Sequence, residues 1–452
     1  RNLANMKTEN IVALCDVDWK YASKTFSDYP KAQRFKDWRQ MFDKMGKSID
    51  AIMVATPDHT HAGVAAHAIT LGKHTYVQKP LAHSVYESRL LTKLAKKYKV
   101  ATQMGNQGNS FDWCRQIAEW VQSGIIGDVY EVHTWTDRPI WPQGLSEPKG
   151  GPAIPADLDW DLFIGPAQKR PYNPAYTPWN WRGFWDFGTG ALGDMACHIM
   201  DPLYWALDLK YPTSVSASST LSNLYSPPQA QVVTYKFPAR PPKEKVNMPE
   251  LKVYWYDGGL LPDRPSELKD GEMMGDENGG IILIGTKGKI MTGCYGMNPT
   301  LLPTSKMADF TQPEPTIPRV KGGNGNIWAT NAHEQDWIRA CKESPSSRRE
   351  SSSNFQFSGP FNEMVVMGVL ATRLSGLQGL HRELQWDGEN MRFSNISPND
   401  KIKIVTVDEY AVIDGDPKFD RRFVEFNALD MVNEWIKHTY HNGFSLPAMP
   451  NS

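Results

Sequence analysis

Apolar and polar positions follow two different periods along the first hundred residues. Short apolar runs of the kind that form buried strands occupy 11–15, 51–55, 75–77 and 100–104. Between them, 62–71 and 84–98 carry helical spacing, and the second begins with a capping-box signature, Ser84 followed by Glu87. Strands that alternate with helices predict an α/β unit built on a parallel, doubly wound sheet.

The pattern changes after residue 108. Strand-like runs follow one another without intervening helices at 213–219, 231–237, 251–255, 280–285 and 289–292. They predict an α+β unit with a large, mainly antiparallel sheet. Helical segments at 331–342 and 362–376 are expected to cover one of its faces, and 343–353 is typical of an exposed loop. We therefore expect a dinucleotide-binding domain at 1–108, a substrate-binding domain at 109–400, and a C-terminal extension at 401–452 with one helix, 427–440.

The composition argues against several classes of partner. The chain has 452 residues with 49 basic and 50 acidic side chains, and it lacks the long Lys/Arg run that marks a nucleic-acid-binding surface. No stretch of about 18 apolar residues indicates a membrane span. The five cysteines are scattered without a CxxC motif, so neither a disulfide framework nor a zinc cluster is expected. Because there is no signal sequence but Arg1 is not a start methionine, a cytoplasmic and an exported protein are both consistent with the sequence.

A dinucleotide-binding unit carries a G-x-G-x-x-G loop about 20 residues before the acidic residue that binds the ribose. Asp16, at the end of the run 11–15, is placed as that acid, but counting back from it passes Arg1. We therefore expect the first strand and its glycine loop to precede this sequence. A G-x-G-x-x-G does occur at 188–193, but it follows an aromatic loop, so we expect it to be a tight loop near a ligand and not the pyrophosphate site.

Polar residues follow two of the predicted strands at the edge where parallel sheets bind ligands. Thr56 and Pro57, with His61 one turn on, come after the run 51–55. Gln78 and Lys79 come after the run 75–77. A lysine desolvated in a cofactor cleft can orient or deprotonate a hydroxyl group, although a lone lysine is more often a surface charge.

A third motif carries Asp194, His198 and Asp201, which would share one face of a helix at i, i+4 and i+7. In one interpretation His198 is a general acid/base and a carboxylate holds its tautomer. In another, the histidine and the two carboxylates bind a divalent metal. In a third, they are only a satisfied polar helix.

Together these motifs resemble the signature of the glucose-fructose oxidoreductase/inositol dehydrogenase/MocA family, over about residues 1–390. The resemblance implies a Rossmann-type domain and an NAD(P)-dependent oxidoreductase that acts on CH–OH groups and has no catalytic metal. It implies that Lys79 is the active-site lysine, His198 the acid/base, and Asp194 a substrate-binding or orienting carboxylate.

The same resemblance assigns the cofactor residues. Asp16 would bind the ribose and favour NAD over NADP, because its charge would repel a 2′-phosphate. The residues that would line the dinucleotide are Thr56, Pro57, His61, Gln78 and Lys79. The sequence differs from the family pattern at two positions. Gln78 replaces the usual glutamate, and Asn106 lies in a turn that usually contains arginine. Asn106 is a candidate for the nicotinamide region.

Aromatic residues suggest the class of substrate. Six tryptophans, at 135, 141, 160, 179, 181 and 185, occur with arginines and tyrosines, a mixture suited to stacking on sugar rings while binding their hydroxyl groups. Core or interface aromatics are the alternative. The candidate substrate-binding residues are Trp141, Tyr172, Arg182, Trp185, Asp194 and Asp201.

Three functions fit this sequence. The leading one is NAD-dependent oxidation or reduction of a secondary hydroxyl of a sugar or sugar-like polyol. The second is an NAD-dependent glycosidase that acts by transient oxidation and elimination, and the third is a non-catalytic carbohydrate-binding protein of the same fold. An open antiparallel sheet commonly packs against a copy of itself, so a homo-oligomer through the C-terminal domain sheet is expected.

Overall fold

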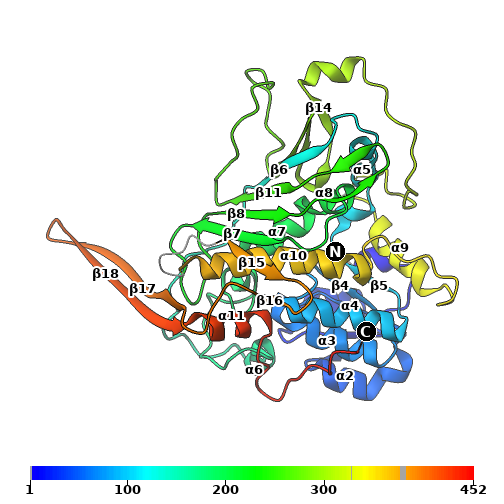
Figure 1. The fold of residues 1–452 in the computed structure, drawn as a ribbon. Coiled ribbons are helices and arrows are strands. Elements are labelled where there is room, and N and C mark those ends of the chain that lie inside the picture. Colours follow the sequence, from blue (N-terminus) through cyan, green and yellow to red (C-terminus); the bar gives the residue numbers. More distant parts are fainter. Residues whose placement is uncertain (1–2, 327, 377–382, 452) are drawn as a thin grey trace.

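The first hundred residues fold as the α/β unit that their periodicity predicts. The computed structural model describes residues 3–326, 328–376 and 383–451 (Figure 1). The strands are β1 (Ala13–Cys15), β2 (Gln33–Phe35), β3 (Ala51–Val54), β4 (His74–Val77) and β5 (Thr102–Met104). The helices are α1 (Ser23–Asp28), α2 (Trp38–Met45), α3 (Asp58–Thr70) and α4 (Val85–Tyr98). All strand pairs in this unit are parallel, and the predicted capping box of Ser84 and Glu87 forms at the start of α4.

These five strands make two separate ladders. β1 pairs with β2, and β3 pairs with β4, which pairs with β5. Within the described residues no strand pairs with the other edge of β1 or of β3. Ala51 at the start of β3 is exposed, which is unusual for a parallel sheet because such sheets are normally buried on both faces.

The second unit is built on a sheet of nine strands among the described residues. Its strand order is β14-β13-β12-β6-β11-β8-β7-β15-β16, and only the pair β6–β11 is parallel. The strands are β6 (Val129–Thr136), β7 (Ser214–Ser219), β8 (Gln231–Phe237), β11 (Leu251–Asp257), β12 (Gly279–Gly285), β13 (Gly288–Gly293), β14 (Thr300–Leu302), β15 (Leu384–Asp387) and β16 (Arg392–Phe393). A small hairpin, β9 (Arg240–Lys243) and β10 (Val246–Met248), stands apart from this sheet. The predicted α/β plus α+β fold class is confirmed.

Two helices, α7 (Gly190–Ile199) and α10 (Phe355–Arg373), pack on the large sheet, and α5 (Asp112–Gln122) packs on α8 (Asp201–Ala206). Helix α6 (Trp160–Ile164) belongs to a separate aromatic cluster. Helix α9 (Ala332–Cys341), which was expected to cover the sheet, packs instead on the first unit, where its Trp337 contacts Tyr76. Short 3-10 turns occupy Leu3–Met6, Gly46–Ser48, Gln107–Ser110, Asn180–Gly183, Cys294–Gly296, Thr304–Ala308 and Leu374–Gly376. Within the ranges that the structure describes, no helix is long and apolar enough to cross a membrane.

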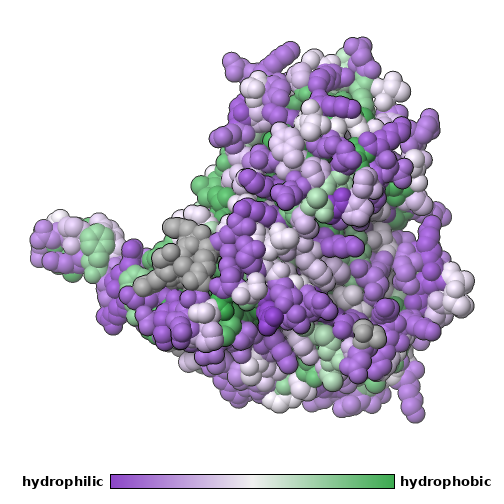
Figure 2. Space-filling model, in the orientation of Figure 1, coloured by the Kyte–Doolittle hydropathy of each residue, from purple (hydrophilic) through white to green (hydrophobic). Residues whose placement is uncertain are grey.

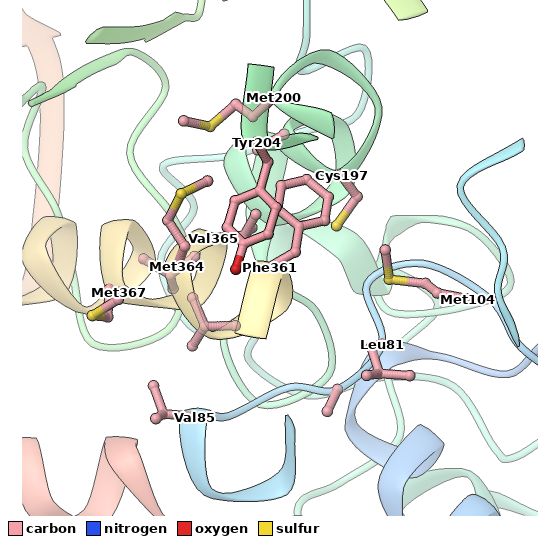
Figure 3. Close-up of a cluster of buried hydrophobic side chains, with 14 of the residues drawn as sticks. Leu81, Val85, Met104, Cys197, Met200, Tyr204, Phe361, Met364, Val365 and Met367 are labelled. Carbon is pink, nitrogen blue, oxygen red and sulfur yellow. The ribbon is translucent and has the colours of Figure 1, made fainter. Parts of the chain in front are cut away.

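Helix α10 lies between the two units and packs on α4, α7, β7 and β8 (Figure 1). Around it, Leu81 and Val85 of the first unit meet Cys197 and Phe361 in one apolar cluster (Figure 3). The helix begins seven residues before the predicted start at 362, because Asn354 caps it by accepting a hydrogen bond from Gln356 N. Both units therefore share a single core.

The C-terminal residues differ most from their prediction. A helix was expected at 427–440, and α11 (Ala428–Ile436) confirms it in shortened form. Before it, β17 (Lys401–Ile413) and β18 (Asp416–Asn427) form a long antiparallel hairpin that the sequence reasoning missed. This hairpin extends away from the rest of the molecule (Figure 1). After α11 the chain returns to the first unit, where Tyr440 Oη donates to Glu87 Oε1 at 2.7 Å.

A stability test follows from the packing of α10 on the sheet. A Cβ at Gly368 would lie 1.9 Å from Tyr235 Oη, and Tyr235 is fully buried, so its ring has little freedom to move. We expect Gly368→Ala to lower the free energy of unfolding by about 1–3 kcal/mol. Gly46→Ala is the matched control, since nothing lies within 4 Å of that Cβ position. Equal urea midpoints for the two variants would contradict this account of the packing.

Candidate active site

Lys79 and Asp194 form an ion pair that joins the two units. Lys79 follows β4, and its Nζ lies 2.7 Å from Asp194 Oδ1 and 3.0 Å from the backbone oxygen of Asp194. Asp194 lies on α7, whose first turn begins at the glycine loop 188–193. Both side chains are largely buried, with 16% and 14% of their surface exposed. The structure thus brings together Lys79 of the first unit and Asp194 of the second.

Asp194 is held as a carboxylate. Burial raises its pKa, but the nearby charges of Lys79 and Arg182 outweigh burial and leave the pKa of Asp194 below its ordinary value. Arg182 Nε lies 3.3 Å from Asp194 Oδ1. The guanidinium of Arg182 lies over the rings of Trp179 and Trp181, at 3.9 and 4.2 Å from their centroids. These stacking contacts fix the arginine where it reaches Asp194.

His198 is one helical turn beyond Asp194 on α7 and is kept neutral. Only 5% of the residue is exposed, and burial, with the charge of Lys79, lowers its pKa to about 3. Its Nδ1 is buried and has no hydrogen-bond partner in the described part of the chain. The ring lies against that of Tyr295, with centroids 4.7 Å apart. A neutral imidazole can accept a proton from a bound hydroxyl group.

Asp201 does not join this group as the i+7 spacing suggested. Helix α7 ends at Ile199 and a new helix, α8, begins at Asp201, so the single helical face is broken. Its carboxylate instead accepts hydrogen bonds from Asn106 Nδ2 at 3.0 Å and Asn109 Nδ2 at 2.9 Å. Burial raises the pKa of Asp201 to about 7. The side chain therefore anchors the turn after β5, and with 1% exposure it offers no surface to a substrate.

His61 connects two of the loops that carry the site. Its Nδ1 lies 2.8 Å from the oxygen of Pro80, and its Nε2 lies 2.8 Å from the oxygen of Thr56. The residue is 1% exposed. Because both ring nitrogens contact backbone oxygens, His61 fixes the loop after β3 against the loop that carries Lys79.

Two buried residues that sequence reasoning missed support the same loops. Asp58, the first residue of α3, accepts hydrogen bonds through Oδ2 from Thr189 N at 3.1 Å and Thr189 Oγ1 at 2.8 Å. Burial raises the pKa of Asp58 to about 7. The one sequence signal for this role was the position of Asp58 directly after Pro57. That signal is unspecific, because acidic residues are common in the first turn of a helix.

Asn362 is the second of these residues. From α10, its Oδ1 accepts a hydrogen bond from Leu81 N at 3.0 Å, and its Nδ2 donates to Ala82 O at 2.9 Å. It thereby fixes the segment that follows Lys79 and Pro80. No local sequence pattern marks this role, because the contact spans about 280 residues.

The glycines of 188–193 pack against the protein itself. A Cβ at Gly188 would lie 2.7 Å from Arg182 Cα, and one at Gly193 would lie 2.0 Å from Thr189 Oγ1. Gly190 has φ +67° and lies next to Pro227. The motif thus serves close packing at the start of α7, and its context differs from that of a pyrophosphate-binding turn.

The predicted aromatic substrate residues are dispersed. Trp141 is buried and donates to Gln143 Oε1, and Trp185 is buried and donates to Asn223 O. Tyr172 packs edge-on against Trp160, with ring centroids 5.3 Å apart. Two of the predicted substrate residues lie at the Lys79 ion pair in the described part of the chain. Asp194 contacts Lys79, and Arg182 contacts Asp194.

The residues expected to line a dinucleotide follow the carboxyl ends of parallel strands, Asp16 after β1, Thr56 after β3 and Gln78 after β4. Asp16 and Gln78 are half-buried there, Thr56 is exposed, and Pro57 lies beside Thr56. Gln78 packs so closely on Gly105 that a Cβ there would lie 2.6 Å from its Oε1. Asn106 is fully buried, with its amide engaged by Asp201 and Ser353, so it supports this edge from within. Within the described ranges, no group of three or more His, Cys, Asp or Glu residues is arranged to hold a metal ion.

Two models of one protein family match parts of this chain. Residues 1–106 match the family model described as "Oxidoreductase family, NAD-binding Rossmann fold", and residues 114–237 match "Oxidoreductase family, C-terminal alpha/beta domain". Together the two matches cover just over half of the chain. Both models carry the name GFO_IDH_MocA.

Individual relatives are more distant. Levoglucosan dehydrogenase from Pseudarthrobacter phenanthrenivorans is 26% identical over 36% of this chain and 34% of its own length. Inositol 2-dehydrogenase from Salmonella paratyphi B is 26% identical over 29% of this chain and 40% of its own length. The chain spans about a quarter to a third of the length of the first curated relatives that it matches, namely 23%, 34% and 29%.

A solved structure extends the likeness over most of the chain. The WlbA dehydrogenase from Bordetella pertussis, determined in complex with NADH and UDP-GlcNAcA, superimposes with a TM-score of 0.53 at 15% identity. The match covers 82% of this chain and 90% of that chain. At this identity the likeness establishes the fold.

The buried carboxyl of Asp58 gives a pH-dependent prediction. Its pKa in the folded chain, about 7, lies above the ordinary 3.8, so the folded chain keeps a proton that the unfolded chain releases. Wild-type stability should therefore fall as pH rises from 4 to 7. Asp58→Asn retains an oxygen to accept the bonds from Thr189 but cannot ionise. Relative to the wild type, it should gain on the order of 1 kcal/mol or more between about pH 4.5 and 7.5 in urea unfolding.

The control for this measurement is Asp263→Asn, which changes an exposed aspartate. Its stability relative to the wild type should be the same at both pH values. If Asp58→Asn behaved in the same way, the proposed burial of an un-ionised carboxyl at the junction of α3 and α7 would be wrong.

Proposed function

The chain belongs to the glucose-fructose oxidoreductase/inositol dehydrogenase/MocA family of oxidoreductases, and on this premise we propose that it transfers a hydride between NAD and a secondary hydroxyl group of a sugar or sugar-like polyol. The observation that carries the proposal is the ion pair of Lys79 and Asp194, with the neutral His198 one turn away. The pair lies where the unit that matches the NAD-binding model meets the second unit.

The residues divide the work as follows. His198 is neutral, so it accepts the proton of the substrate hydroxyl during oxidation and returns it during reduction. The ammonium of Lys79 stabilises the oxygen as negative charge develops on it. Asp194 holds Lys79 in place through two of its oxygens. When bound, NAD takes up or supplies the hydride.

The cofactor would lie along the edge of Asp16, Thr56 and Gln78. A carboxylate at Asp16 suits the ribose hydroxyl groups and disfavours the 2′-phosphate of NADP.

The substrate class rests on Arg182 and the two tryptophans that enclose it. Indole faces next to charged hydrogen-bonding groups suit the alternating apolar and hydroxyl surfaces of a sugar. A homo-oligomer through the large sheet is supported by a half-buried row of side chains on it, in which His133 stacks on Tyr254 with ring centroids 4.9 Å apart.

Substitution of the acid/base tests the proposal. We expect His198→Asn to lower kcat by about 10²–10⁴-fold with a panel of sugars and inositols, because the proton transfer loses its acceptor. NADH binding, followed by quenching of protein fluorescence, should stay within a factor of about three. His441→Asn, in the C-terminal segment, is the matched control and should keep wild-type turnover. Undiminished turnover in His198→Asn would overturn the assignment.

The protonation state of His198 can be measured directly. Because burial lowers its pKa to about 3, the imidazole should stay neutral as pH falls through 6.5, the ordinary histidine value. Histidine carbon NMR, with His198→Asn used to assign the signal, should show no titration between about pH 8 and 5. A midpoint near 6.5 would mean that the site does not keep His198 as a neutral base.

Product analysis separates this function from its two alternatives. A dehydrogenase forms NADH in proportion to the oxidised sugar, whereas a glycosidase acting by transient oxidation would release cleaved sugar without net NADH. A carbohydrate-binding protein would bind sugar without either change. We expect net NADH, read at 340 nm alongside chromatography of the products.

A further inference from the structure

The hairpin of β17 and β18 exposes apolar side chains that the rest of the molecule does not cover. Its outer part shows Tyr410 at 64%, Val412 at 58% and Phe419 at 74% exposure. It projects from the body, and Figure 2 shows apolar side chains on this projection (Figures 1 and 2). A two-stranded hairpin is marginally stable in water by itself, so such a projection indicates a binding partner.

The two edges of the hairpin are not equivalent. At its base, β17 is bridged by Asn223, and Leu224 N donates to Val405 O. β18 has β17 as its sole paired strand among the described residues, and nearly all of its residues are exposed. The outer edge of β18 is therefore the accessible one, and it carries unpaired backbone groups that can extend the sheet.

The charges along β18 are self-complementary. The segment 416–422 reads Asp-Pro-Lys-Phe-Asp-Arg-Arg. If this segment is paired antiparallel with a copy of itself about Phe419, Asp416 faces the partner's Arg422 and Lys418 faces the partner's Asp420. All four charged residues lie on one face of the strand, where Arg422 already contacts Asp420 at 2.6 Å. The pairing therefore gives an alternating network of opposite charges, which stabilises cross-strand neighbours.

The same register aligns the aromatic residues on the other face. Tyr410 is directly opposite Phe419 within the hairpin, with ring centroids 5.2 Å apart. Placing Phe419 opposite the partner's Phe419 continues this pair into a row of four rings across four strands. It also brings the tip of each hairpin beside the base of the other, where Phe423 and Val424 are exposed.

Backbone geometry is compatible with this register. Asp414 and Gly415 form the two-residue turn, with φ of 53° and 85°, so the pair Ile413 and Asp416 closes the hairpin. Alternation along the ladder then turns the backbone groups of Pro417, Phe419 and Arg421 outward. Phe419 and Arg421 can donate to the partner, and Pro417, which lacks an N–H, can only accept. Pro417 thus limits the added ladder to the region around Phe419.

We propose that β18 is a dimerisation edge, through which two copies of this chain pair antiparallel about Phe419 to form a four-stranded sheet. The corresponding pairing of β17 about Tyr410 would place Asp408 opposite the partner's Val412, without charge complementarity. Because the paired segments are short, the contact is expected to dissociate on dilution. It is separate from the proposed oligomer through the large sheet, and it does not depend on the enzymatic activity.

Disulfide trapping tests the register. Residues facing each other on the two-fold axis have Cα atoms about 5.5 Å apart, within disulfide range. We expect Phe419→Cys to give a covalent dimer on mild oxidation, seen on non-reducing gels. Tyr410→Cys is the matched control: it is similarly exposed, but in the proposed sheet it lies three strand spacings, roughly 14 Å, from its copy. Equal trapping of both variants, or trapping of neither, would overturn the proposal.

Charge exchange tests the complementarity. Lys418→Asp with Arg422→Asp makes an acidic edge, and Asp416→Lys with Asp420→Lys makes a basic one. Alone, each double variant should lose the wild-type association through this edge in sedimentation velocity at low salt, and an equimolar mixture should restore it. Association of each variant alone at the wild-type level, or no restoration in the mixture, would show that the edge does not pair with itself.

Discussion

Helix α10 is the element on which the arrangement of the site depends. Most of its side chains are buried, and it lies between a helix of the first unit and the sheet of the second. A helix that is apolar nearly all around must be covered on all sides, and here the covering elements include α4, which follows the loop that carries Lys79, and α7, which carries His198. The same helix supplies Asn362, which binds the segment after Lys79. Packing of one helix therefore sets the distance between residues of two units.

Local patterns were sufficient to predict the fold class, but they did not predict the hairpin near the C-terminus. The strands at 51–54 and 231–237 and the helix 85–98 follow from periodicity, because burial on one face or both leaves a direct trace in the sequence. The hairpin 401–427 shows no comparable periodicity. The outer parts of its two strands are exposed on both faces, and their residues are mixed in polarity. Its turn, Asp414–Gly415, was the available signal, and that dipeptide is a strong hairpin former.

Local patterns also place some residues of the candidate site correctly and miss others. Lys79, Asp194 and His198 were predictable, because strand ends and i, i+4 spacing are local features that place side chains at one edge. Asp201 was not, because the break between α7 and α8 at Met200 redirects its carboxylate to Asn106. The roles of Asp58 and Asn362 were also beyond local reasoning. Each acts on a partner more than 100 residues away, and such contacts are set by tertiary packing.

At the junction of the two units, the pKa of each buried carboxyl group depends on whether a cationic side chain contacts it. Asp58 and Asp201 are buried with neutral donors for partners, and their pKa values rise to about 7. Asp194 is buried beside Lys79 and Arg182, and its pKa falls. Of these three groups, Asp194 is the one held as a carboxylate, where it binds Lys79, and Lys79 in turn helps to keep His198 neutral. If the two units separated, Lys79 would leave Asp194 and His198 would regain water. His198, the proposed proton acceptor, and Lys79, the cation proposed to stabilise the developing alkoxide, therefore lie together only when the two units are packed as they are here.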